Sequence, residues 1–105
     1  KKISPIDAFK PKVSKRPHKV MVDNQSSSFF TIIEVFTYDF PGLLFVITDA
    51  LYRQGLDIWV AKISTKIDQV VDVFYVRDIH GQKVDSDQQV SEIKAAVYER
   101  LPRII

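Results

Sequence analysis

A chain of 105 residues with 46% hydrophobic content is long enough to bury the core of one domain of ordinary size. No apolar run approaches the roughly 20 residues that a membrane-spanning helix needs, so we expect no membrane partner. Cysteine is absent, which excludes disulfides and thiol chemistry and fits a cytoplasmic protein. Because the chain opens with neither methionine nor a signal peptide pattern, we expect a fragment of something longer.

The formal net charge of +2 conceals an uneven distribution. Residues 1–19 contain seven basic side chains and one acid, whereas residues 20–105 contain eight basic and twelve acidic ones. Prolines 5, 11 and 17 punctuate the basic segment, which favours an extended connector. We predict a flexible basic linker at 1–18 and a folded domain at 19–105. A basic tail that binds nucleic acid or an acidic partner is the alternative.

The first elements read as a β-hairpin followed by a helix. Lys19–Asp23 alternates between polar and apolar residues, and Phe30–Tyr38 is rich in β-branched and aromatic residues, so both are predicted strands. The polar cluster 24–28 between them predicts a turn. Residues 41–54 carry apolar side chains at helical spacing, and Gly55 follows where a C-terminal glycine is expected.

The second half repeats this pattern. Leu56–Lys66 and Gln69–Asp78 are predicted strands joined by a turn at residues 67–68. Ser86 and Gln89 resemble a capping box that opens a second helix, which Pro102 ends. The order β-β-α-β-β-α predicts an α+β, permuted ferredoxin-like sandwich, with an antiparallel four-stranded sheet and two helices on one face.

The strand that begins at Gln69 is apolar on both sides. Val71, Val73 and Tyr75 point one way, and Val70, Asp72, Phe74 and Val76 point the other way. Since two helices cover only one face of a sheet, the other face meets a protein partner or faces solvent with its aromatic residues.

The segment Asp39-Phe-Pro-Gly-Leu-Leu44 joins a predicted strand to a predicted helix. Free N–H groups at a helix start can receive a carboxylate, and the N–H groups of Gly42 and Leu43 are the candidates. Asp39 either caps the helix or pairs with the ammonium group of a bound amino acid. The segment is therefore either a capped turn or a ligand site.

The sequence shows no catalytic constellation. His18 lies in the basic tail and His80 in a turn, and neither has a partner at metal-ligand spacing. The three glycines form no phosphate-binding loop. Asp72 occupies the strand where an RNA-recognition sheet needs a basic residue, so we expect no nucleic acid partner.

Several of these segments resemble ACT domains, the small-molecule-sensing modules of amino-acid and nitrogen metabolism. Asp-x-Pro-Gly-Leu is typical of ACT domains in general. Over residues 19–101 the chain is more specifically similar to the C-terminal ACT domain of bacterial PII uridylyltransferase/uridylyl-removing enzymes. The matching segments are Val22-Asp-Asn24, Thr31-Ile-Ile-Glu-Val35, Asp39-Phe-Pro-Gly-Leu-Leu44, Gly55-Leu-Asp-Ile58, Ala61-Lys-Ile63, Val70-Val-Asp-Val-Phe-Tyr-Val76, Asp78 and Gly81-Gln-Lys83.

The resemblance implies a regulatory, non-catalytic domain that senses L-glutamine or another small amino acid beside a neighbouring ACT domain or a second copy. The parent enzyme would modify PII protein with UTP and Mg²⁺, and this fragment would hold no cofactor. A docking or dimerisation module without a ligand is the alternative. The family places the effector at Asp39, Phe40, Pro41, Gly42, Leu43 and Leu44, with Ala61 and Lys62 as further candidates. The chain departs from the pattern at Phe40, where arginine is usual, and at 66–68, where a glycine is usual.

Overall fold

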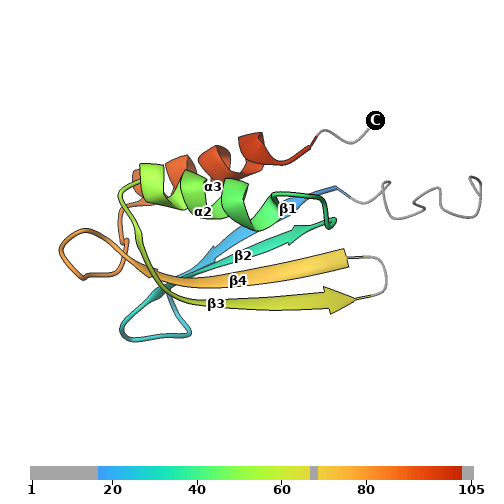
Figure 1. Ribbon diagram of the computed structural model, residues 1–105. Helices are drawn as coiled ribbons and strands as arrows, with labels where there is room; N and C mark the ends of the chain where they lie inside the picture. Colours follow the sequence, from blue (N-terminus) through green and yellow to red (C-terminus); the bar gives the residue numbers. More distant parts are fainter. Residues whose placement is uncertain (1–16, 67–68, 103–105) are drawn as a thin grey trace, which may run out of the picture.

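The computed structural model describes residues 17–66 and 69–102. Within them the chain forms β1 (Lys19–Asp23), β2 (Thr31–Thr37), α2 (Leu43–Arg53), β3 (Asp57–Lys66), β4 (Gln69–Arg77) and α3 (Asp87–Arg100). The strands make one antiparallel sheet in the order β1-β2-β4-β3, and both helices cover the same face (Figure 1). The predicted ferredoxin-like α+β arrangement is confirmed. Residues 1–16 of the linker predicted at 1–18, and the turn predicted at 67–68, lie outside the described residues.

The start of α2 differs from the prediction. The helix begins at Leu43 rather than at Pro41, because Gly42 adopts a left-handed conformation with φ of 83° and ψ of 6°. The N–H of Leu43 donates to the carbonyl of Phe40 at 3.1 Å. Proline followed by a glycine with positive φ, closed by this bond, is the signature of a type II turn. The strand before it also stops early, at Thr37.

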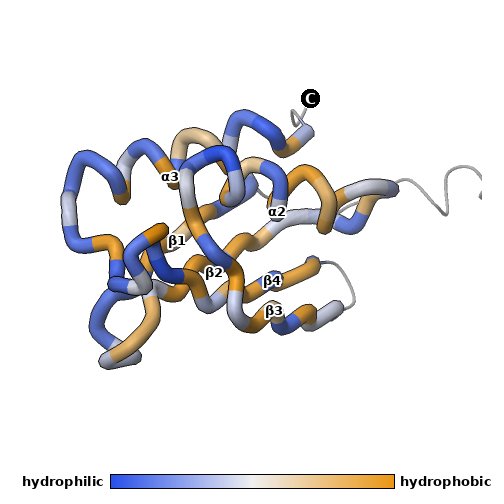
Figure 2. Tube along the Cα trace, turned by 60° about the vertical axis from the view of Figure 1, so that its left-hand side comes forward, coloured by the Kyte–Doolittle hydropathy of each residue, from blue (hydrophilic) through white to orange (hydrophobic). Residues whose placement is uncertain are grey.

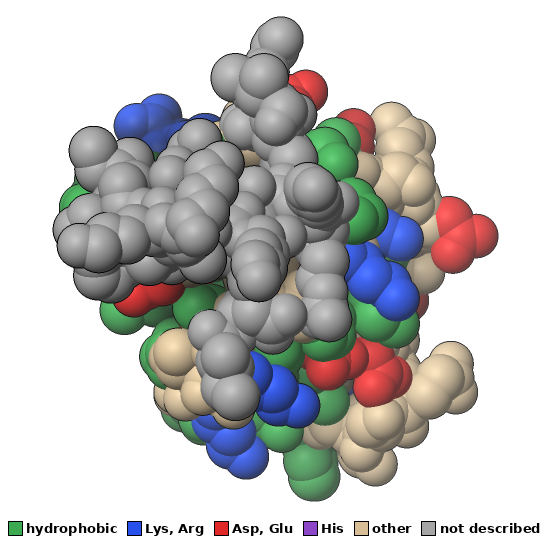
Figure 3. All heavy atoms as spheres, turned by 90° about the vertical axis from the view of Figure 1, so that its right-hand side faces the viewer, with side chains coloured by type: hydrophobic (Ala, Val, Ile, Leu, Met, Phe, Trp, Pro, Cys, Tyr) green, Lys and Arg blue, Asp and Glu red, His purple; other side chains and the backbone are tan. Residues whose placement is uncertain are grey.

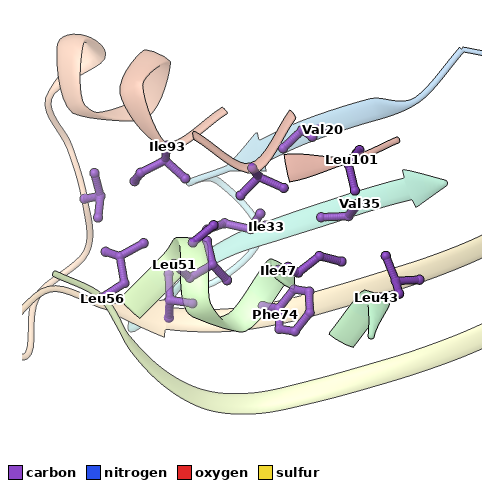
Figure 4. Packing of buried hydrophobic residues seen from close by; sticks show 14 of the residues in the cluster. Val20, Ile33, Val35, Leu43, Ile47, Leu51, Leu56, Phe74, Ile93 and Leu101 are labelled. Atoms are coloured by element: carbon purple, nitrogen blue, oxygen red, sulfur yellow. The ribbon is translucent and has the colours of Figure 1, made fainter. Parts of the chain in front are cut away.

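The core lies between the helices and the sheet. Phe74, Ile33 and Val35 rise from the central strands to meet Ile47 of α2 and Ile93 of α3 (Figure 4). All five are fully buried. Along the tube in Figure 2, α3 carries mainly hydrophilic residues on its outer side, whereas the strands hold long hydrophobic stretches. The helices therefore contribute amphipathic faces to a single apolar layer.

Strand β4 alternates as predicted. Its inward residues, including Asp72 and Phe74, are buried beneath the helices, whereas Val71, Val73 and Tyr75 are half-buried on the open face of the sheet. The edge strand β3 behaves differently. Ile63 pairs with Asp72 and therefore faces the helical side, yet it is 52% exposed. The two helices thus leave a strip of the sheet uncovered beside α2.

His18 belongs to the folded domain and not to the linker in which the sequence analysis placed it. Its ring is buried, with Nδ1 2.8 Å from the hydroxyl of Thr37 and Nε2 hydrogen-bonded to the carbonyl of Pro102. Because a carbonyl only accepts, Nε2 donates and Nδ1 accepts from Thr37. The folded part therefore includes at least one residue before β1.

A buried polar network ties the β1–β2 turn to the segment before α3. Thr31 Oγ1 accepts from the N–H of Val84 at 2.8 Å and donates to Asn24 Oδ1 at 2.6 Å. Asn24 Nδ2 in turn donates to the carbonyl of Val84 at 2.6 Å. Each of these polar groups has a partner, as buried polar groups require.

Replacing Thr31 with valine is expected to lower the free energy of unfolding by about 1–2 kcal/mol, because the buried N–H of Val84 loses its acceptor. Urea denaturation measures the change. Thr48→Val is the matched control, since the hydroxyl of Thr48 bonds carbonyls of its own helix near the surface. Equal losses in the two variants would contradict a structural role for the network.

Candidate binding pocket at the start of helix α2

A pocket of about 310 Å³ lies where the β2–α2 loop meets the ends of β3 and β4. Its walls come from the loop, from the first turn of α2 and from the helical side of the two strands. The residues that line it are Asp39, Phe40, Gly42, Leu43, Leu44, Phe45, Ile63, Thr65, Val70 and Asp72. Seen from this end of the molecule, hydrophobic side chains lie among both acidic and basic ones (Figure 3).

The helix start offers unpaired hydrogen-bond donors to this pocket. The first helical bond runs from the N–H of Val46 to the carbonyl of Gly42. Within the described residues, the N–H groups of Gly42, Leu44 and Phe45 therefore have no acceptor. No acid lies in the first turn of α2. The positive end of this helix is uncompensated, which favours an anion.

One predicted donor is excluded. The N–H of Leu43, which we expected to hold a carboxylate, already donates to Phe40 within the type II turn. The N–H groups of Leu44 and Phe45 have no acceptor among the described residues and are the candidate donors instead. Their N–H groups could have been predicted from the sequence only if the turn type had been recognised from the order Pro41-Gly42.

Asp39 does not cap the helix. The N-cap residue is Gly42, and no side chain caps it. The side chain of Asp39 forms no hydrogen bond or ion pair with any residue between 17 and 102 that the structure describes. It is exposed at the rim of the pocket. Of the two roles that the sequence left open for Asp39, the structure excludes the cap, and the ligand role stays a prediction.

Asp72 is the unexpected member of the pocket. It lies on the inward face of β4, is 1% exposed, and its Oδ1 has no hydrogen-bond partner among the described residues. Burial raises the pKa of this carboxyl, and the nearby charge of Asp39 raises that pKa further. The alternation of β4 predicts Asp72 on this face, but no sequence motif assigns it to the site. The available signal was a single acid in an otherwise apolar inward row.

The structure does not bring the remaining predicted residues into the pocket. Ala61 faces the helical side opposite Phe74 but does not line the pocket, and Pro41 is exposed in the turn. Lys62 lies on the opposite face of the sheet, with its ammonium 5.1 Å from the ring centroid of Tyr75. Strand β3 contributes Ile63 and Thr65 to the pocket instead.

Within the described residues, no group of three or more His, Cys, Asp or Glu side chains could hold a metal ion. No helix in the same ranges is long and apolar enough to cross a membrane.

The fold and this pocket define a small ferredoxin-like α+β domain with charged and apolar groups gathered at a loop–helix junction. The chain is homologous to a short segment of bifunctional uridylyltransferase/uridylyl-removing enzymes. It is 39% identical over 94 residues to the enzyme of Azospirillum brasilense, which covers 90% of the chain. It is 38% identical over 91 residues to that of Rhodospirillum rubrum, covering 83%, and 40% identical over 83 residues to that of Nitrobacter hamburgensis, covering 79%.

The chain spans about a tenth of the length of these curated relatives. No protein-family model matches it, and no solved structure matches it.

Proposed function

We propose that this chain is a regulatory ACT domain of a cytoplasmic enzyme that uridylylates and deuridylylates PII protein, and that it senses L-glutamine. The domain itself is non-catalytic in this proposal, and Mg²⁺ and UTP serve the enzyme's other parts. Homology to uridylyltransferase/uridylyl-removing enzymes supports the parent enzyme. The observation that supports the sensing role is that residues with free helix N–H groups and residues with carboxylates line the same small pocket.

This arrangement is complementary to an amino acid. The N–H groups of Gly42, Leu44 and Phe45 attract the ligand's carboxylate, and Asp39 at the rim attracts its ammonium group. The walls formed by Leu43, Ile63 and other apolar side chains leave room for a short side chain.

Signalling needs a second body that the ligand brings closer or pushes away. Apolar side chains surround the pocket, with Phe45 66% exposed on α2 and Ile63 52% exposed on β3. A neighbouring ACT domain or a second copy of this chain would cover them. A ligand shifts such an equilibrium only by its differential affinity for the two arrangements, typically by about 1–3 kcal/mol.

The same exposed side chains favour a second candidate function, a docking or dimerisation module without a ligand. That function predicts self-association that depends on protein concentration and is indifferent to amino acids. Sedimentation over a concentration series distinguishes the two, because a monomer at every concentration contradicts the docking module and is compatible with a sensor.

The test of sensing is a titration of the isotopically labelled chain with L-glutamine, followed through backbone amide shifts. L-Glutamate and L-serine serve as controls. We expect selective shifts of the amides of Gly42, Leu44 and Phe45, because these N–H groups gain an acceptor. An absence of shifts at millimolar L-glutamine would overturn the proposal that this chain senses it.

Gly42→Val is expected to weaken glutamine binding at least about tenfold while the domain stays folded. Gly42 lines the pocket, and a Cβ on it would meet no other atom within 4 Å, so a side chain fits there without a clash and adds bulk beside the proposed ligand. The positive φ adds a strain of about 1–2 kcal/mol. Gly81→Val is the matched control, because Gly81 has φ of 76° and equally open surroundings but lies in the β4–α3 loop. Unchanged affinity in Gly42→Val would remove this pocket as the site.

A further inference from the structure

The buried carboxyl of Asp72 lowers the stability of the fold unless a hydrogen-bond donor or a cation pairs with it. Asp72 stands in the inward row of β4 between Val70 and Phe74, where water reaches 1% of its surface. Native proteins leave few buried polar atoms without a partner, and such atoms often mark a functional site. Oδ1 of Asp72 is the one such side-chain atom within the described residues.

A neighbouring carboxylate adds to the cost of burying Asp72. Asp39 acts on Asp72 with the same sign, and neither carboxylate forms an ion pair with a described residue. Two adjacent carboxylates without a counter-ion call for a cation from outside this part of the chain. Two carboxylates supply too few oxygen ligands for a calcium ion, which takes six to eight. A protonated amine, with three donors, fits this pair better.

The same ligand is expected to contain an anionic group beside its cationic one. The pocket that Asp72 lines is also lined by Gly42, Leu44 and Phe45, the residues whose backbone N–H groups are unpaired within the described part of the chain. The two acids and these three residues border the same space of about 310 Å³. Its chemistry selects a small molecule in which ammonium and carboxylate lie close together.

We propose that Asp72 is a specificity-determining residue of the pocket, which accepts hydrogen bonds from the ammonium group of a small zwitterion whose carboxylate lies at the start of α2. This inference rests on the proposed binding function. It adds that Asp72 is the residue that recognises the ammonium group of the ligand. Asp39 supplies a negative charge at the rim of the pocket. Asp72 supplies a buried one, which favours ligands with an ammonium group over ligands without it.

The test compares L-glutamine with its analogue 4-carbamoylbutanoate, which has hydrogen in place of the α-ammonium group. Affinities are measured by amide shift titration for the wild type, for Asp72→Asn and for Glu34→Gln. Glu34→Gln is the matched control, because Glu34 is an acid of β2 on the open face of the sheet, paired in register with Val73. A standard amide spectrum establishes that each variant is folded.

We expect the wild type to bind L-glutamine at least about tenfold more tightly than the analogue. The loss of a hydrogen bond to a charged group typically weakens binding by about this factor or more. Asp72→Asn is expected to lose that preference, with affinity for the analogue unchanged within about threefold. Glu34→Gln is expected to keep it. A wild-type preference that survives in Asp72→Asn would overturn the inference and leave glutamine sensing intact.

Titration with a panel of the standard amino acids can refute glutamine sensing while leaving the role of Asp72 intact. Binding of a different amino acid, weakened by Asp72→Asn, would refute glutamine as the ligand and support the role of Asp72. A pocket that binds no member of the panel would overturn both.

Discussion

Replacing Phe74 with alanine is expected to lower the free energy of unfolding by about 3–5 kcal/mol, the largest effect of any substitution considered. Phe74 is fully buried at the centre of β4 and lies beneath α2 beside Ile47 (Figure 4). Truncation removes its apolar surface from the core and leaves a cavity that both the sheet and the helix must tolerate. Because a domain of this size has only about 5–15 kcal/mol of stability, the variant is close to unfolding.

Chemical denaturation followed by circular dichroism measures this loss. Phe29→Ala is the matched control, because Phe29 is 69% exposed in the loop before β2. We expect the control to change stability by less than about 0.5 kcal/mol. If the two truncations cost the same, the core does not lie where the structure places it.

Most of the fold could be predicted from the sequence because its signals are local. The alternation along β4 places Phe74 and Asp72 on one side and Tyr75 on the other, and the structure agrees. The N-cap predicted at Ser86 is also present, with the side chain of Ser86 accepting from the N–H of Gln89 at 3.3 Å. Such features depend on side-chain period and on short-range chemistry, which a sequence displays directly.

The sequence did not predict the positions of side chains that depend on tertiary contacts. His18 sits in a proline-punctuated basic segment, yet Thr37 and Pro102, distant in sequence, satisfy both its ring nitrogens. The family resemblance predicts Lys62 in the site. The register with β4 places it opposite Val73, and so on the open face of the sheet. Neither outcome could be derived without knowing which residues, distant in sequence, meet in the folded chain.

The candidate site was predictable as a segment but not as a set of chemical groups. The residues Asp39 to Leu44 mark a strand-to-helix junction, and the pocket forms there. The second acid comes from another strand, and alternation alone shows only that Asp72 points inward. Whether a partner reaches a buried carboxylate depends on every element packed over it.

For the free protein, Asp72→Asn is expected to raise the free energy of unfolding at pH 7, because burial penalises ionisation of the carboxyl and an amide cannot ionise. The same variant is expected to lose the ligand preference. Stability and recognition would then oppose each other at this residue, as they commonly do at binding sites.

The gain should depend on pH with a definite sign. Burial raises the pKa of Asp72 in the folded protein above its value in the unfolded chain. Below the unfolded pKa both states hold the proton, and the carboxyl imposes no charge penalty. As pH rises towards the raised pKa, the unfolded state releases its proton first, so the wild type loses stability; above the raised pKa the full penalty is present. The advantage of Asp72→Asn should therefore grow as pH rises through this window and then level off.

Other carboxyls act in the opposite sense but cancel in the comparison. Hydrogen bonds lower the pKa values of Asp23, Asp49 and Asp78, through Ser26, Arg53 and Gln82 respectively as the first cause. Their contributions are lost on acidification in both proteins alike. Urea denaturation of the two proteins at a series of pH values between about 3 and 8 isolates Asp72, because only the difference between the proteins is used. A variant that is less stable than the wild type throughout this range would mean that the carboxylate of Asp72 is satisfied in the free protein, and the cation would then have no reason to bind there.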